Sequence, residues 1–377
     1  MGEPSPDAGA WRERARSFAD RIVRPRAGGI DRDDRIPDDI MRALASERFF
    51  GLGLPREWDG EGGDTRSTVA VLEAISHASA AVAVTLAVHL SVCAQPILTW
   101  GTPSQKERFL RPLARGEQVG AFALTEPDAG SDTASLATRY WREADSYVLR
   151  GTKMFTSNAA SAGVVLVFAT HDPALGSHGI TAFIVPPGTA GFSVAQRLDK
   201  MGLRGSETTE LVLENVRLPV DSMLGPEGAG LKVALSALAG GRVGIASCAL
   251  GVAQAAFDEM LTSVRARDED WKRTRLAQAY SELASARALV DTAAERMDAG
   301  APFAREASVA KLVASRAAVS IASAGVDVAG PTGTRAGHPA ERLLRDARVF
   351  PIVEGTTEIQ ELILGRSLLS ATEPPNP

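Results

Sequence analysis

The sequence predicts an α+β multidomain protein in which helical regions flank a β domain. Residues up to about 118 carry apolar side chains at helical spacing. Between 119 and 222 the pattern changes to short β-rich runs separated by Gly, Pro, Asp and Asn. From 223 onward, long and largely apolar helical segments return. We therefore expect an N-terminal α-helical domain (1–118), a middle β-barrel or sandwich domain (119–222) and a C-terminal four-helix bundle (223–377).

The N-terminal region begins with a helix over Trp11–Arg26, whose apolar positions follow the helical period. Pro25 and the glycine pair Gly28 and Gly29 are expected to end it. Farther along, Ala80–Trp100 is apolar on nearly every side, which is typical of a buried helix.

The middle region contains six short runs rich in β-branched and aromatic residues, which indicates a small barrel or sandwich. These runs are Val119–Thr125, Tyr147–Ser157, Val164–Thr170, Gly179–Pro186, Gly191–Leu198 and Thr209–Pro219.

Four apolar or amphipathic segments joined by short polar or Gly/Pro loops predict the bundle. They are Leu231–Val264, Arg273–Ala299, Glu306–Ala329 and Glu358–Ser370.

Composition excludes several classes of function. The net charge is −5 with both signs interspersed, so a nucleic-acid surface is not expected. The five histidines have no metal-ligand spacing, so no metal site is expected. Cys93 and Cys248 lie in apolar helical segments and are expected to be reduced core residues. Since neither a secretory signal nor an uninterrupted apolar span is found, we expect a cytoplasmic protein that does not bind a membrane.

One carboxylate lies in a setting suited to general-base chemistry. Glu354 follows the apolar run Val349–Val353 and precedes Gly355. Apolar neighbours disfavour the charged form, so its pKa should rise, and Gly355 leaves the backbone open to a ligand. A general base for a weakly acidic C–H needs these conditions. The alternative interpretation is an acidic residue favoured at the N-terminus of the following helix.

Two loops of the β region present polar groups. Ala121–Asp132 leaves the first strand into a tight turn whose backbone N–H groups and hydroxyls suit a polar ring edge or a phosphate. In Lys153–Ala159, Phe155 and Ser157 would share a strand face and could meet a flat heterocycle. A strand end with a turn, and a core phenylalanine, are the structural alternatives.

Five stretches in matching order resemble the acyl-CoA dehydrogenase family over nearly the whole chain. They are LPREWDGEGGD (Leu54–Asp64), AFALTEPDAGSD (Ala121–Asp132), MGLRGSETTELVLENVRLP (Met201–Pro219), GRVGIASCALGVAQAAFDEM (Gly241–Met260) and RDARVFPIVEGTTEIQ (Arg345–Gln360).

The resemblance implies an FAD-dependent flavoenzyme that removes the α-proton of an acyl thioester while the β-hydrogen leaves as hydride. Glu354 would be the catalytic base. In some members the base instead stands just before Arg242, where this chain has Gly241. Ser131, Arg242 and Gly355 would contact the substrate. The residues implied to bind FAD are Phe122, Leu124, Thr125, Gly130, Ser131, Phe155, Ser157, Arg267, Gly330, Thr356 and Glu358.

The chain departs from the family pattern where family members reach the FAD of a neighbouring subunit. Asp270 and Trp271 replace Phe-Gly, and Asp327 replaces a usual Gln. Pro331 has no N–H to donate to a phosphate. These changes predict weaker or different contacts to the ADP part of FAD. Val353 also stands where a tyrosine is common before the base.

The resemblance implies partners as well: an acyl-CoA or acyl-carrier-protein thioester, an electron-transfer flavoprotein as acceptor, and a second copy in a homodimer or homotetramer. Two alternatives remain open. One is a flavin oxidase or monooxygenase on the same fold, and the other is a non-catalytic member that has lost FAD.

Overall fold

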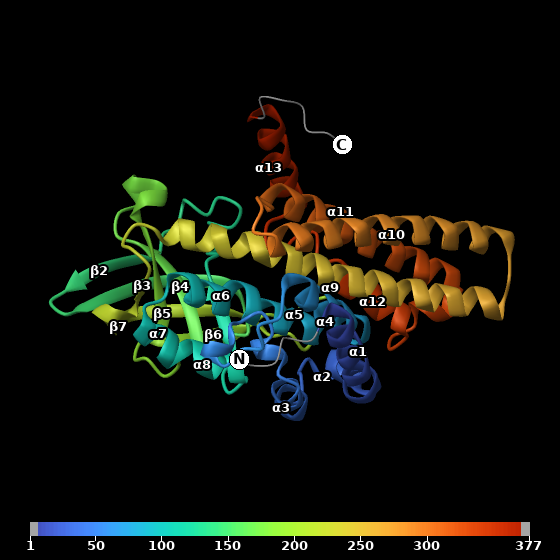
Figure 1. The fold of residues 1–377 in the computed structure, drawn as a ribbon, viewed down its shortest axis with the longest axis horizontal. Helices are drawn as coiled ribbons and strands as arrows, with labels where there is room; N and C mark the ends of the chain where they lie inside the picture. The colour runs from blue at the N-terminus through green and yellow to red at the C-terminus, as the bar shows by residue number, and fades with distance from the viewer. Residues whose placement is uncertain (1–6, 371–377) are drawn as a thin grey trace.

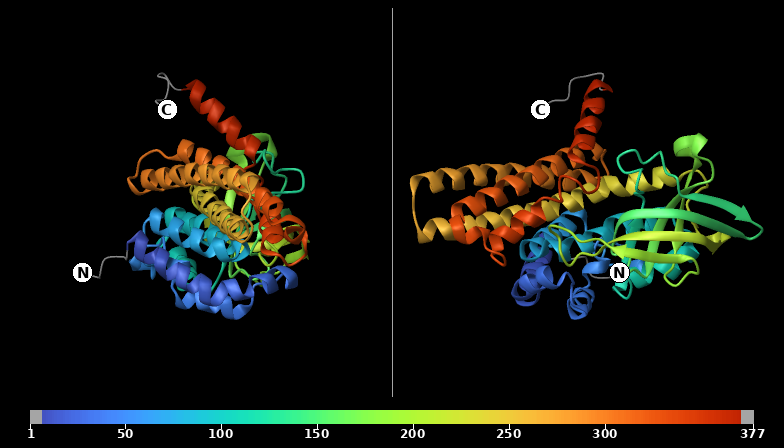
Figure 2. Two further views of the ribbon diagram at one scale, coloured as in Figure 1. Left: turned by 90° about the vertical axis from the view of Figure 1, so that its right-hand side faces the viewer. Right: turned by 180° about the vertical axis from the view of Figure 1, so that it is seen from behind.

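The computed structural model describes residues 7–370. The β-sheet lies at one end of an elongated molecule, the long C-terminal helices extend away from it, and the N-terminal helices pack along one side of these long helices (Figures 1 and 2). The order helix, sheet, helix agrees with the predicted three-domain architecture.

The N-terminal region is a set of short helices around the longer α4 and α5. The α-helices are α1 (Ala8–Phe18), α2 (Ala27–Asp33), α3 (Asp38–Ser46), α4 (Thr65–Ala78), α5 (Ala80–Val88), α6 (Gln95–Trp100), α7 (Pro103–Gln105) and α8 (Arg111–Arg115).

The expectation that Pro25 and the glycine pair end the first helix is wrong. The chain stays helical to Asp33 by changing its hydrogen-bond pattern: a π-turn (Ala19–Val23, η1) is followed by a 3₁₀ turn (Arg24–Arg26, η2). These turns accommodate the N–H that Pro25 lacks.

The middle region forms one eight-stranded sheet in which β6, β7, β3, β2, β4, β5 and β8 follow one another, and β1 pairs in parallel with β4. The strands are β1 (Gly120–Ala123), β2 (Arg139–Glu143), β3 (Ser146–Ser157), β4 (Val164–Thr170), β5 (Ile180–Val185), β6 (Phe192–Arg197), β7 (Thr208–Pro219) and β8 (Met223–Leu224). β4 and β5 are buried along their whole length, so they form the centre of this domain.

The C-terminal region contains three long helices, α9 (Gly230–Ala266), α10 (Asp270–Asp298) and α11 (Ala304–Ala329). The sequence analysis did not anticipate α12 (Pro339–Ala347), which packs on α9 and α11 beside them. The last helix, α13 (Thr357–Ser370), contacts α11 and projects from the body of the molecule (Figures 1 and 2).

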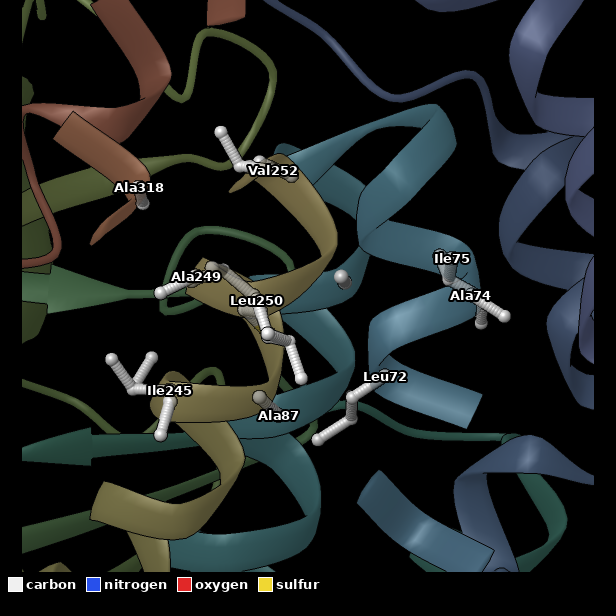
Figure 3. Close-up of a cluster of buried hydrophobic side chains, with 14 of the residues drawn as sticks. Leu72, Ala74, Ile75, Ala87, Ile245, Ala249, Leu250, Val252 and Ala318 are labelled. Atoms are coloured by element: carbon white, nitrogen blue, oxygen red, sulfur yellow. The ribbon is translucent and has the colours of Figure 1, made fainter. Parts of the chain in front are cut away.

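The main core joins the N-terminal helices to the bundle. Helix α9 lies between α4 and α5 on one side and α11 on the other. Figure 3 shows Leu72 and Ala87 on one side of α9, beside Leu250, and Ala318 on the other. The small side chains of α9 at this level let the helices approach closely, so the two helical regions share one apolar core.

Three helical stretches are long and apolar enough to cross a membrane by length and composition: Ala80–Trp100, Gly230–Ala266 and Ala304–Thr334. In this structure, 83% of the most apolar 18-residue stretch of Ala80–Trp100 is buried inside the protein. The corresponding share is 72% for Gly230–Ala266 and 50% for Ala304–Thr334. The first two therefore supply core to the fold, and the expectation of no membrane contact stays a prediction.

Helix α12 connects all three regions. Arg345 makes a bidentate ion pair with Asp31 of α2, at 2.8 and 2.7 Å. The next residue, Asp346, accepts a 2.6 Å hydrogen bond from the backbone N–H of Leu203, in the loop before β7. Asp346 is fully enclosed, and burial raises its pKa to about 6.

Candidate active site

Glu354 lies in the turn between α12 and α13, and its backbone is left-handed, with φ of 53°. Gly355 follows with φ of 96°. A non-glycine residue in this region costs about 1 kcal/mol or more, so the surrounding contacts must hold the turn. The turn directs the side chain of Glu354 inward, against helix α9.

The carboxylate of Glu354 lies directly over Gly241 of α9. A Cβ added at Gly241 would lie 1.9 Å from one carboxylate oxygen of Glu354, well inside contact distance. The side chain therefore occupies the space that any larger residue at position 241 would need. The resemblance noted above places an alternative base at position 241, and the overlap leaves room for a carboxylate from only one of these two positions, which here is Glu354.

Glu354 as a whole is half-buried, but both its carboxylate oxygens are enclosed and have no hydrogen-bond partner among the described residues. Burial raises its pKa to about 8, against the opposing charges of Arg242 and Lys311, which lower it. The predicted rise in pKa agrees with this environment. A buried, unpaired carboxylate of this kind is suited to accept a proton from a ligand.

Arg242 is buried next to Glu354 on α9, and its Nε atom has no partner within the described part of the chain. Burial lowers its pKa, and the charge of Glu354 opposes that change. Orphaned polar atoms on both residues are what a site built around an absent polar ligand would show.

Sequence reasoning missed two residues that hold the turn. Lys311 of α11 donates to the carbonyl of Gly355 at 2.7 Å, and Gln360 of α13 donates to the same carbonyl at 3.1 Å. Lys311 is one of three basic residues in this helix, with Arg305 and Arg316, so the sequence gave no signal that distinguished it.

The predicted flavin-contacting residues of the sheet domain come together at the ends of β1 and β3. The backbone N–H of Met154 donates to the carbonyl of Thr125 at 2.8 Å, and the buried Lys153 donates to the carbonyl of Leu124 at 3.1 Å. Lys153 also forms a buried ion pair with Glu126 at 2.7 Å. These contacts bring the segment after β1, which leads to Gly130 and Ser131, against the segment that carries Phe155.

Phe155 is 64% exposed and has a left-handed backbone, with φ of 55°. It lies where the pairing of β3 with β7 slips, between Lys153 and Thr156. The bulge interrupts the alternation of strand faces, so the argument that Phe155 and Ser157 share a face does not apply here. An aromatic ring held outward on a strained backbone is suited to contact a flat ligand, so the residues present fit a flavin.

The other predicted FAD residues fall into two places. Thr356 and Glu358 lie beside Glu354, at the start of α13. Arg267 lies in the α9–α10 connection, at the end of the bundle remote from the sheet (Figure 1). Gly330 follows α11, which runs antiparallel to α10, and so belongs to the same remote end. One chain does not bring Arg267 and Gly330 together with the sheet residues.

A cavity of about 310 Å³ runs between α4, α6 and the segment of α9 that meets Glu354. Gly240, Val243 and Gly244, which surround Gly241 in the sequence, line one wall. Leu72, Ala87, Leu90 and Phe303 make the cavity largely apolar, with Ser91, Gln95, Thr99 and Ser236 as polar groups. Neither Gly241 nor Glu354 lines the cavity, but the adjacent Gly240 does, and the volume and lining suit a small, mainly apolar substituent.

Within residues 7–370, no group of three or more His, Cys, Asp or Glu side chains is arranged to hold a metal ion. The candidate site is thus built from one enclosed carboxylate, the two buried cations Arg242 and Lys311, a nearby cavity and a polar loop with an exposed aromatic ring.

Family models for the N-terminal, middle and C-terminal domains of acyl-CoA dehydrogenase match residues 5–117, 121–216 and 228–369. The chain belongs to the acyl-CoA dehydrogenase family. It is 37% identical over 361 residues to the short-chain specific acyl-CoA dehydrogenase of Clostridium acetobutylicum, covering 94% of this chain and 95% of that one.

Solved structures of the family agree closely with this fold. Butyryl-CoA dehydrogenase from Megasphaera elsdenii superposes with a TM-score of 0.94 at 36% identity, covering 98% of this chain and all of that chain. A chain from a structure described as the electron transferring flavoprotein of Acidaminococcus fermentans gives 0.95 at 33% identity, covering 98% and 100%. As an acyl-CoA dehydrogenase family member, this protein is an oxidoreductase flavoenzyme acting on CH–CH groups.

Proposed function

We propose that this acyl-CoA dehydrogenase family member oxidises a short acyl thioester to its α,β-unsaturated product, with Glu354 as the base. The observation that carries the proposal is the enclosed, unpaired carboxylate of Glu354, which lies against Gly241 beside the cavity. The names of two relatives, one short-chain specific and one acting on butyryl-CoA, support a short acyl group.

The residues of the chain have separate tasks in this reaction. The acyl chain enters the apolar cavity, and burial within the protein raises the pKa of Glu354 and so makes it a stronger base. Glu354 takes the α-proton and holds it on its carboxylate. The backbone N–H of Glu354 donates no hydrogen bond within the described residues, so it is free to donate to the thioester carbonyl as negative charge develops there. Arg242 favours the ionised form of the base before the transfer.

FAD is the proposed cofactor, and when bound it supplies the acceptor for the hydride that leaves the β-carbon. Phe155, Thr125 and Ser131 would hold its ring system at the sheet, and Thr356 and Glu358 would lie near it on α13. Arg267 and Gly330, at the remote end of the bundle, would serve the FAD of a second copy, which favours a homodimer or homotetramer. An electron-transfer flavoprotein is the proposed acceptor, supported by the description of one structural neighbour.

The test is the visible flavin spectrum of the purified protein on addition of butyryl-CoA, with longer acyl-CoAs and the butyryl-carrier-protein thioester for comparison. We expect butyryl-CoA to bleach the flavin band without O₂, and the Glu354→Gln variant to show no bleaching. Bleaching by the carrier-protein thioester alone would reassign the acyl carrier.

Two outcomes would replace the proposal. A yellow protein that no thioester bleaches but that consumes O₂ with another reductant would indicate an oxidase or monooxygenase. A colourless protein that does not take up added FAD would indicate a non-catalytic member, and would assign the loss to the altered positions Asp270, Trp271, Asp327 and Pro331.

A further inference from the structure

Lys311 is a buried lysine that forms no ion pair among the described residues. Its side chain comes from the middle of α11, and its Nζ donates to one neutral acceptor, the carbonyl of Gly355, at 2.7 Å. A buried ammonium without a carboxylate partner is costly. A neutral donor could hold the same carbonyl at a lower cost, so the charge itself calls for an explanation.

The same face of α11 holds both ends of the turn that carries Glu354. Lys311 and Ser315 are four residues apart and so lie one above the other on the helix. The hydroxyl of Ser315 donates to the carbonyl of Phe350 at 3.2 Å, while Lys311 holds the carbonyl of Gly355. Ser315 therefore holds one end of the turn through a hydrogen bond from an uncharged side chain.

The charged groups around Lys311 come from three elements: Glu354 in the turn, Glu358 on α13 and Arg242 on α9. Burial lowers the pKa of Lys311 to about 8, the two carboxylates oppose that change, and Arg242 adds to it. In return, Lys311 and Arg242 lower the pKa of Glu354, which burial alone would raise further. The charge of Lys311 thus acts on the base through space.

We propose that Lys311 is a positioning residue for the base: it fixes the carbonyl of Gly355, and hence the left-handed turn that directs Glu354, and its charge favours the carboxylate form of Glu354. This inference rests on the proposed role of Glu354. It adds a residue on a different helix, α11, whose single side chain both hydrogen-bonds to the turn and places a positive charge near Glu354.

Three variants separate the two parts. Lys311→Gln removes the charge and shortens the donor by one bond, while Gln360 still donates to the carbonyl of Gly355. Lys311→Arg keeps the charge, and Ser315→Ala removes the neighbouring anchor only. The readout is the pH profile of flavin bleaching by saturating butyryl-CoA. The rise of the bleaching rate with pH, here called the ionisation limb, reports the ionisation of Glu354. In Lys311→Gln we expect this limb to move up by about one pH unit, so that the bleaching rate at neutral pH falls about tenfold. Ser315→Ala should keep the pH profile of the parent enzyme, whereas Lys311→Arg, whose charge does not titrate in this range, should keep the profile or move it to lower pH.

A second readout does not need activity. The pH dependence of thermal stability is compared between each variant and the same variant carrying Glu354→Gln, which isolates the titration of Glu354. The stability difference within each pair changes with pH as Glu354 ionises. The pH of that change should rise only in the variant that lacks the charge of Lys311. An unmoved limb in Lys311→Gln, or an equal shift in Ser315→Ala, would overturn the inference. If no thioester bleaches the parent enzyme, the proposed function fails, while this stability cycle still decides the coupling of Lys311 to Glu354.

Discussion

Glu354 and Gly241 compete for one volume, and this competition makes the base sensitive to a single methyl group. A Cβ at position 241 would overlap the carboxylate, but the overlapped atoms are at the end of a flexible side chain and can move. We expect Gly241→Ala to fold and to lose about 100-fold in the rate of flavin bleaching, because a displacement of about 1 Å misaligns the base. Stopped-flow reduction by butyryl-CoA measures this.

Gly325→Ala, in helix α11, is the matched control for that variant, since its Cβ would meet only atoms at an ordinary contact distance of 3.6 Å and lies outside the cavity. It should keep most of the parent rate. Full activity in Gly241→Ala would show that the carboxylate does not react from the position described here.

Removing the charge of Glu354 should stabilise the protein while it abolishes catalysis. Burial raises the folded-state pKa from 4.5 to about 8. Between these values the unfolded state binds fewer protons than the folded state, so stability falls as pH rises from about 4.5 to 8. At pH 7 this amounts to about 3 kcal/mol. Glu354→Gln should lack this loss, which chemical unfolding at pH 5 and pH 8 would detect as a smaller difference between the two pH values.

Single residues were predictable where the sequence carries the reason locally. Apolar neighbours and Gly355 predicted the raised pKa of Glu354, because both effects come from adjacent positions. The role of Lys311 was not predictable, since it depends on α11 packing against Gly355, which lies 44 residues later in the chain. Similarly, the resemblance indicated that Gly241 could not be a base. Only the structure shows that the missing side chain at Gly241 leaves the space that the carboxylate of Glu354 occupies.

Strand β1 begins at Gly120, and a buried histidine from the helical region holds its first residue. His89 accepts from the N–H of Gly120 at 3.1 Å through Nδ1, and its Nε2 lies 3.2 Å from the carbonyl of Phe50. Burial lowers the pKa of His89 to about 4. The neutral ring thus joins the strand that leads to Thr125 to the N-terminal helices.

We expect His89→Leu to lose about 2 kcal/mol at pH 7, because it leaves a buried N–H and a buried carbonyl unpaired. The parent protein should lose stability as pH falls from about 6.5 toward 4, since the unfolded state then binds the extra proton. The variant should lack this loss, so the difference should shrink at pH 5 in urea unfolding. The exposed His178→Leu should follow the parent, and a constant difference at both pH values would contradict the assignment.

Regular elements were predicted well and their irregularities were not. The long segments of α9, α10 and α11 lie within a few residues of their expected bounds because their apolar periods are long. β2 was missed because its residues are mostly charged and exposed. The π-turn and 3₁₀ turn around Pro25 and the bulge at Phe155 also escaped prediction, since the period of apolar residues does not record a change of hydrogen-bond pattern or of strand register.

Polar contacts join the three regions of the molecule in addition to the shared core. Arg345→Met removes the bidentate pair with Asp31, both of whose side chains are mostly buried. We expect a loss of about 2 kcal/mol and a broader thermal transition, because a partly buried carboxylate remains unpaired between two regions. Arg316→Met, which removes an exposed pair with Glu361, should cost less than about 1 kcal/mol. Calorimetry would measure both, and equal losses would remove the coupling role from Arg345.

The order of the regions was predictable over the whole chain, but their relation in space was not. A change in the spacing of apolar residues distinguishes helical from strand regions in the sequence. No local signal shows that α4, α5 and α9 share a core, or that Arg267 lies far from the sheet residues that accompany it in the family pattern.

The overlap of Gly241 with Glu354 also limits how such a protein can evolve. Moving the base from the turn to helix α9 needs two substitutions, and each alone gives a poor enzyme. A glutamate added at position 241 meets the existing carboxylate, while a glycine at position 354 leaves no base at all. With Glu354 as the proposed base, the two positions are therefore epistatic, because a change at either one alone gives a poor enzyme and a functional switch requires both.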